Sequence, residues 1–191
     1  MKKTKLFLIL CATALLCGCS KPAPEEPYVP EDGIARLGSR ITVEPFDQLT
    51  LLEVNDSLSK KGLYYATWKD GEASPYENRQ GDTVDLYDAQ LTFLASEAVD
   101  ELEAKENYNF WISTAEENYD VYETETITCN EQEYTLMSYN RNDEDSPHPH
   151  GMSAFAINGK TGVCIEFTCS EDYNKDLKPI LTDFLEHCKI G

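Results

Sequence analysis

The sequence predicts an α+β domain in which an antiparallel β-sheet is flanked by a long central helix and a C-terminal helix. Two kinds of periodicity lead to this prediction. Short segments of alternating apolar and polar residues recur before and after the middle of the chain, which is typical of strands with one buried face. Two other segments, one central and one C-terminal, repeat apolar residues every three or four positions, which is typical of helices.

The first 19 residues predict export and attachment to lipid. Residues 1–18 begin with lysines and continue into an apolar run, a secretory signal that is too short to span a membrane. The run ends in Leu16-Cys17-Gly18-Cys19, which resembles the bacterial lipobox, where the last cysteine receives lipid before cleavage in front of it. We therefore expect a lipoprotein signal peptide over residues 1–18 and a diacylglyceryl cysteine with palmitate at Cys19. A plain signal peptide with an incidental Cys19 is the alternative.

The lipid on Cys19 predicts an anchor at the extracytoplasmic face of a bacterial cell membrane. Two or three acyl chains hold a protein there stably, at about 0.8 kcal/mol per buried methylene. Residues 19–33 are rich in proline and glutamate, which predicts an extended tether of about 3 Å per residue. Residues 34–191 are expected to form a single α+β domain, long enough to enclose a hydrophobic core.

The chain is strongly acidic. Sixteen lysines and arginines stand against 35 aspartates and glutamates, a net charge of −19. Loss of residues 1–18 removes three lysines and no acids, so the charge of the remaining chain is −22. Such a surface repels phosphate backbones and anionic headgroups, which argues against nucleic acid as a partner. The simplest role of the charge is to keep the protein soluble.

The first half of the domain predicts strands joined by a polar segment. Residues 41–46, 49–54 and 62–68 are short apolar or aromatic runs that favour strands or strand edges. Residues 69–82 hold glycine, proline and asparagine and predict a turn-rich connection. Residues 83–95 alternate between apolar and polar side chains, so at least their second half is predicted as a strand.

The central helix is predicted over residues 96–119. Ser96 is a suitable N-cap, and acidic residues follow it closely, where the positive end of a helix dipole favours them. No proline or glycine interrupts the segment. One apolar face is expected to pack against the sheet, formed by Ala98, Leu102, Tyr108, Trp111, Ile112, Ala115 and Tyr119.

A four-strand meander and a closing helix are predicted to follow. The strands are expected at residues 121–129, 133–139, 152–157 and 162–169, and Asn158-Gly159 marks the turn of the second hairpin. The closing helix is expected within residues 172–188, with a true start near Leu177 because Pro179 is tolerated only in a first helical turn.

Four cysteines remain after the signal and the lipidated residue are set aside, and outside the cytoplasm they can form disulfides. The predicted layout brings Cys188 to the end of the sheet that carries Cys129 and Cys164, so we expect Cys188 to bridge one of these two. No bridge is expected between Cys164 and Cys169, because five strand residues separate them by about 17 Å. The pairing of Cys169 stays open.

The order of strands, a long helix that carries Trp111, a four-strand meander and a closing helix resembles the PsbP-like family over residues 41–189. The resemblance implies an alpha-beta-alpha sandwich around an antiparallel sheet. It also implies a non-catalytic assembly or binding factor, and it transfers no site residues because no motif supports it. Residues 62–65 and 184–188 further resemble small secreted lipoproteins of gut-type anaerobic bacteria with no assigned activity.

One loop predicts a metal site. His148 and His150 are two residues apart and flanked by prolines, so an extended chain projects both imidazoles to one side, where Asp145 can complete the ligands of Zn²⁺ or Cu²⁺. The alternative is a solvated loop between two strands, in which acids, prolines and glycine are common.

Aromatic residues predict a second kind of site. Tyr64, Tyr65 and Tyr76 lie in the first half of the domain, and exposed aromatic rings can stack on sugars or on peptide side chains. Trp68 and Tyr87 lie in the same half, but tryptophans are more often in the core than on a binding surface, so we expect Trp68 and Trp111 to be core residues.

No GxSxG, HExxH or phosphate-binding glycine motif is present, and no cofactor is predicted. We therefore expect a non-enzymatic binding or assembly module, held to the membrane by Cys19 and associated with an envelope protein complex. A metal-binding lipoprotein that uses His148 and His150 is the alternative, and a hydrolase is a distant third.

Overall fold

The computed structural model of the protein describes residues 28–78, 80–143 and 145–191. The predicted signal peptide, Cys19 and the first part of the predicted tether lie outside the described residues. None of the described helices is long and apolar enough to cross a membrane. At the end of the predicted tether, Tyr28 forms an isolated bridge with Val54 of the main sheet.

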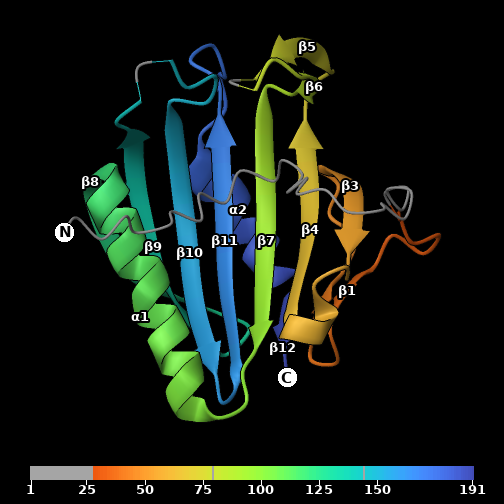
Figure 1. Ribbon diagram of the computed structural model, residues 1–191, viewed down its shortest axis with the longest axis vertical. Coiled ribbons are helices and arrows are strands. Elements are labelled where there is room, and N and C mark those ends of the chain that lie inside the picture. The colour runs from red at the N-terminus through yellow and green to blue at the C-terminus, as the bar shows by residue number, and fades with distance from the viewer. Residues whose placement is uncertain (1–27, 79, 144) are drawn as a thin grey trace.

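The centre of the fold is a seven-stranded antiparallel sheet (Figure 1). Its strands follow the order β3 (Thr50–Asn55), β4 (Leu63–Asp70), β7 (Ala89–Glu97), β11 (Thr161–Cys169), β10 (His150–Asn158), β9 (Gln132–Arg141) and β8 (Tyr119–Cys129). The strands β8 to β11 form the predicted meander, with β7 paired to β11 across the middle of the sheet. A short 3-10 helix, η1 (Ser59–Lys61), joins β3 to β4.

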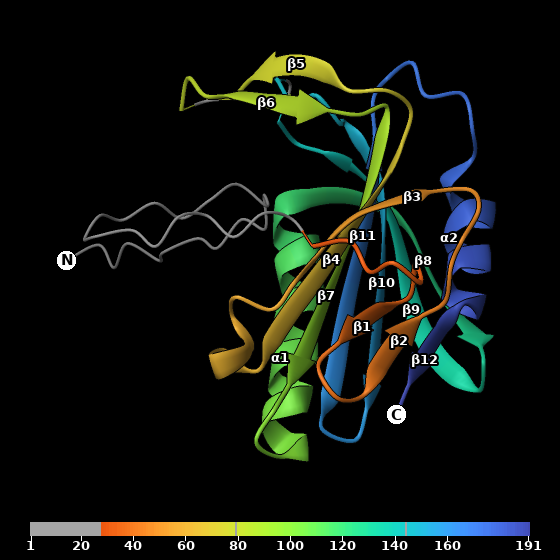
Figure 2. The same cartoon turned by 90° about the vertical axis from the view of Figure 1, so that its right-hand side faces the viewer.

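Two smaller sheets flank this centre. In the first, β2 (Ile41–Val43) lies between β1 (Ala35–Leu37) and the C-terminal strand β12 (Cys188–Ile190). The second is a hairpin of β5 (Ser74–Glu77) and β6 (Thr83–Leu86), which projects at one end of the molecule (Figure 2). The sequence predicts only a turn-rich connection where β5 lies, because its residues are mainly polar.

The two helices lie against opposite faces of the main sheet (Figure 2). Helix α1 (Glu101–Asn118) packs on β8, β10 and β11, and helix α2 (Leu177–Glu186) packs near β8, β10 and β12. The larger hydrophobic core lies on the α2 side and a smaller one lies under α1. The structure is therefore α+β with a large antiparallel sheet and two helices, as the sequence predicts.

Alternation along β11 decides which side chain joins which core. Val163, Ile165 and Phe167 belong to the core on the α2 side, whereas Cys164 packs on the α1 side. This is the division that a strand with a two-residue period predicts. On the α2 side, Phe184 meets the ring of Trp68 edge to face, at 4.9 Å between centroids, so the structure places Trp68 in the core.

The predicted start of the central helix is wrong. Ser96 and Glu97 belong to β7, and Ser96 is buried opposite Gly162 of β11. The helix begins at Glu101, where the side chain of Asp100 accepts a hydrogen bond from the Glu103 amide at 2.9 Å. Pairing with β11 keeps residues 96–97 extended, so the helix is 18 residues long and shorter than predicted.

Candidate functional site

The predicted metal ligand His148 is buried in a hydrogen-bonded position. Its Nε2 donates to the carbonyl oxygen of Tyr87 at 2.7 Å, and its Nδ1 lies 2.9 Å from Oγ1 of Thr168. A carbonyl oxygen only accepts, so Nε2 carries the proton and Nδ1 accepts from the threonine hydroxyl. Burial lowers the pKa of His148, which favours this neutral form.

His150 has different partners. Its Nδ1 lies 2.8 Å from the side-chain oxygen of Asn140, and its Nε2 lies 3.0 Å from a carboxylate oxygen of Glu171. His150 is opposite Cys169, which faces the α2 side, whereas the Thr168 partner of His148 faces the α1 side.

The metal prediction is therefore not supported by this geometry. β10 begins at His150, so His148 is outside the strand and the two imidazoles do not project to the same side. Asp145 is exposed in the loop, and its amide bonds to the side chain of Asp143. Among the residues that the structure describes, no group of three histidines, cysteines or acids is arranged to hold a metal ion.

The three tyrosines of the predicted aromatic site are not brought together. Tyr64 packs against the core on the α2 side. Tyr65 is the next residue of β4 and points to the other face, where burial and the nearby charge of Glu53 raise its pKa. Tyr76 is on β5, in the separate hairpin. Stacking on a ligand by all three rings is not possible in this arrangement.

The predicted disulfide is also not formed, since all four described cysteines are free thiols. Cys164 lies on the α1 face of the sheet, so the sheet separates it from Cys188 on the other face. The C-terminal helix ends at Glu186, and Cys188 begins β12 opposite Val43. Its thiol donates to the carbonyl oxygen of Phe184 at 3.4 Å.

A buried polar cluster that sequence reasoning missed surrounds Glu166 of β11. One carboxylate oxygen, Oε1, accepts hydrogen bonds from Tyr139 at 2.7 Å, Tyr119 at 2.9 Å and Arg141 at 3.1 Å. The rings of Tyr119 and Tyr139 stack with centroids 4.1 Å apart. These residues come from three strands, and only the alternation of β11 hinted that Glu166 faces α1.

Gly151 gives this cluster its room. A β-carbon at that position meets Cζ of Tyr139 at 2.5 Å, which is closer than such contacts occur. The glycine thus lets the tyrosine ring lie directly on the backbone of β10. The cluster joins β8, β9 and β11, because its hydrogen bonds run between residues of these three strands. The hydrogen bonds also offset the free energy that the Glu166 carboxylate loses when water is removed from it.

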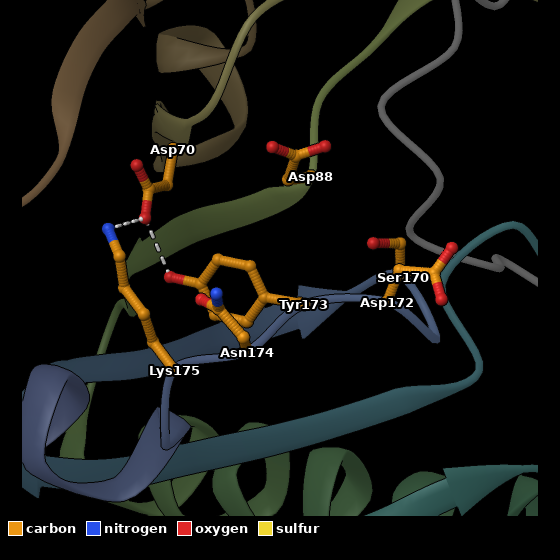
Figure 3. Close-up of a pocket in the computed structure, with 7 residues that line it drawn as sticks. All are labelled: Asp70, Asp88, Ser170, Asp172, Tyr173, Asn174 and Lys175. Carbon is orange, nitrogen blue, oxygen red and sulfur yellow. Dashed lines mark hydrogen bonds and ion pairs between the residues drawn. The ribbon is translucent and has the colours of Figure 1, made fainter.

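A pocket of about 200 Å³ lies between the end of β4 and the segment that connects β11 to α2 (Figure 3). Tyr173 and Lys175 both point toward Asp70, and the hydroxyl of Tyr173 donates to it at 2.8 Å. Burial raises the pKa of Asp70, but hydrogen bonds from Lys175 and Tyr173 outweigh this and the pKa is lowered. The pocket also has Asp88 and Asp172 on its wall.

Exposed apolar side chains are concentrated in and next to helix α1. Four of the seven large apolar side chains that are strongly exposed in the described residues lie beside, on or just after this helix: Val99 at 80%, Leu102 at 67%, Phe110 at 62% and Tyr122 at 65%. The sequence assigned Leu102 to the buried face of the helix, and this assignment is wrong. Only Ala104 and Ala115 of α1 are fully buried.

Leu102 and Phe110 belong to one exposed line along the helix. At 100° per residue, positions 102, 106, 110, 113 and 117 fall within about 80° of one another. We define the outer stripe of α1 as Leu102, Glu106, Phe110, Ser113 and Glu117, all of which are exposed. It points away from the sheet, because the buried Ala104 and Ala115 lie on the opposite side of the helix.

The structure is similar to the solution structure of cyanobacterial PsbP from Synechocystis sp. PCC 6803, with 14% sequence identity, 70% of this chain and 89% of that chain covered, and a TM-score of 0.41. It is also similar to a crystal structure from Pseudomonas aeruginosa, described as a protein of unknown function and putative regulator, with 11% identity, 61% and 95% coverage and a TM-score of 0.38. No family model matches the sequence, and no curated protein is similar to it in sequence. PsbP is thus among the solved structures that this chain is similar to, as the order of its elements predicts.

Proposed function

We propose that the protein is a lipid-anchored, extracytoplasmic bacterial lipoprotein that acts as a non-enzymatic binding or accessory module for an envelope protein complex. The observation that carries the binding role is the group of exposed apolar side chains at α1. Monomeric proteins bury most such side chains, and a group of them on one surface is typical of an interaction site. The lipobox at Leu16-Cys17-Gly18-Cys19 supports the anchor.

The helix holds Leu102 and Phe110 of this group in place. Its N-terminus is capped by Asp100, and the Val99 amide donates to Glu103 at 2.7 Å. On its inner side, the hydroxyl of Tyr108 lies 2.9 Å from that of Thr135. A surface that is ordered before binding loses little conformational entropy when a partner docks.

The alternatives have less support. A metal-binding lipoprotein needs the imidazoles of His148 and His150 together, and these bond to separate partners on different sides of the sheet. Calorimetric titration with Zn²⁺ and Cu²⁺ tests this alternative, and site-specific binding lost in His148→Ala and His150→Ala would restore it. The hydrolase alternative is tested with a panel of esterase, peptidase and glycosidase substrates. Turnover of any of these substrates would contradict a non-enzymatic role.

Crosslinking in the native membranes tests the proposed function directly. The protein is crosslinked in place, purified and compared with a Cys19→Ala variant that cannot be acylated. We expect one envelope complex to be enriched with the parent and lost with the variant. If no protein is enriched with the parent at a range of crosslinker lengths, the proposed function is wrong.

A further inference from the structure

The outer stripe of α1 combines apolar and acidic side chains. Glu106 lies one turn from both Leu102 and Phe110, and Glu117 follows at the C-terminal end of the stripe. The whole helix has five glutamates and one lysine. The apolar side chains are therefore surrounded by negative charge.

The charges at the end of the helix are unusual. The C-terminus of a helix carries partial negative charge and favours lysine, arginine or histidine. α1 has no basic residue in its last turn, which contains Glu116 and Glu117. Within the residues that the structure describes, neither of these glutamates forms an ion pair. The negative charges of Glu116 and Glu117 thus repel the negative end of the helix dipole. A positively charged side chain of a partner would reduce this repulsion.

These charges discriminate between possible occupants of the stripe. Anionic lipid headgroups are repelled by the glutamates, so the membrane surface is a poor occupant. A second copy brings the same acids and the same net charge, −22 without residues 1–18, to the interface, which also opposes association. A segment with lysines or arginines beside apolar side chains meets both features of the stripe.

We infer that the outer stripe of α1 is a docking site for a basic, apolar segment of an envelope protein. The partner's apolar side chains cover Leu102 and Phe110, and its lysines or arginines approach Glu106 and Glu117. This inference rests on the proposed function, because it names the partner chemistry of that same binding surface.

A peptide probe tests the chemistry. The probe is an 18-residue amphipathic helix of leucine and lysine, and its counterpart has glutamate in place of lysine. Both are titrated by fluorescence anisotropy against the mature chain, residues 19–191, carrying Cys19→Ala, which has neither lipid nor the apolar signal and needs no detergent. We expect the lysine peptide to bind more tightly, with an affinity that falls as salt rises.

Matched variants locate the binding. The double substitution Leu102→Ser, Phe110→Ser is expected to lower the affinity for the lysine peptide at least about tenfold, because apolar residues at the centre of an interface contribute most of the binding energy. Glu106→Gln with Glu117→Gln is expected to reduce both the affinity and its salt dependence. Leu58→Ser and Glu72→Gln alter exposed residues elsewhere and serve as controls with unchanged binding. All variants should keep the parent melting temperature, because their side chains are exposed.

Several outcomes overturn the inference. Equal binding of the two peptides excludes a basic partner, and full binding by the Leu102→Ser, Phe110→Ser variant excludes the stripe. If the protein binds phosphatidylglycerol vesicles and this binding needs Leu102 and Phe110, the stripe binds lipid. If sedimentation shows a dimer that needs the same two residues, the stripe binds a second copy.

Photocrosslinking in cells separates this inference from the proposed function. A benzoylphenylalanine at position 110 is compared with one at position 58. We expect position 110 to capture a segment rich in lysine or arginine and apolar residues. Capture of an acidic segment at position 110 refutes the basic partner, and capture of a partner from position 58 alone refutes the stripe, but both results keep the binding role. Capture of no protein at either position, together with no enrichment by the chemical crosslinker, refutes both.

Discussion

At the scale of single residues, His148 shows how a potential metal ligand becomes part of the fold. The same imidazole that could donate a lone pair to a metal ion here joins Tyr87, just before β7, to Thr168 of β11. Both ring nitrogens are used and the side chain is only 5% exposed. The sequence shows that two histidines are close along the chain. Burial of each side chain and its hydrogen-bond partners decide what the ring nitrogens contact.

His148 is expected to make stability depend on pH. Its pKa is lowered in the folded state, so below about pH 6.5 the unfolded chain binds a proton that the folded protein does not. The contribution of neutral His148 to the free energy of unfolding is therefore fully present above this pH. It decreases as the pH falls toward the folded pKa, by at most about 1.4 kcal/mol per pH unit. Urea denaturation between pH 5 and 8 measures the slope. We expect His148→Gln to flatten it, and an unchanged slope would show that other groups are responsible.

The Glu166 cluster is expected to contribute strongly to stability. Glu166→Ala removes the acceptor of three hydrogen bonds and the ionic partner of Arg141, which is largely buried. Loss of one member of such a pair costs about 3–5 kcal/mol. Tyr139→Phe leaves the other donors in place and is expected to cost about 1.5–3 kcal/mol, the range for a hydrogen bond to a charged group. Denaturation of both single variants and the double variant measures the coupling, and additive effects would mean that the bond between them contributes little.

At the scale of elements, the turn between β8 and β9 has a backbone that its sequence does not favour. Asn130 and Glu131 have φ values of 49° and 64°, the left-handed pair of a two-residue hairpin turn. Asparagine tolerates this region, whereas glutamate is strained in it. The side chain of Asn130 also donates to the backbone oxygens of Glu186 and Cys188, which fixes the turn against the end of α2.

Glu131→Gly is therefore expected to stabilise the protein by about 0.5–1 kcal/mol, because glycine adopts positive φ without the steric cost. Asn130→Gly is the matched variant. It removes the two side-chain hydrogen bonds and is expected to destabilise. Thermal denaturation with a van't Hoff analysis compares the two. A loss of stability in Glu131→Gly would contradict the strain at this position.

The elements that the sequence predicts well are those set by local pattern. The strand predicted at residues 162–169 follows from side-chain period, and the start of the closing helix near Leu177 follows from Pro179. Both predictions are confirmed, by β11 (Thr161–Cys169) and by α2 (Leu177–Glu186). The start of α1 depends on a choice between Ser96 and Asp100 as the cap, and the pairing of Ser96 with Gly162 decides it. The Glu166 cluster collects residues from three strands, so no local pattern could reveal it.

At the scale of the whole molecule, all four described cysteines are free and are buried or nearly so. Burial raises the pKa of Cys129 and Cys169 to about 11 and raises those of Cys164 and Cys188 further. The reactive thiolate is therefore scarce near neutral pH.

These four thiols are expected to react with iodoacetamide slowly at pH 8 in the folded protein and completely in denaturant. Mass spectrometry of the labelled peptides measures each site. Reductant is expected to leave the melting temperature unchanged. A peptide map without reductant that joins Cys188 to Cys129 would contradict this and restore one of the two predicted bridges.

The pairing of β2 with β12 has a consequence for the order in which the protein matures. Ile41 lies opposite Ile190, so a strand near the start of the domain pairs with one near its end. The small sheet cannot close until residues 188–190 have been synthesised, however early β1 and β2 leave the ribosome. Contacts between such distant segments form late and slowly. The proposed export of the chain fits this design, because the fold is completed only when the last strand has been added.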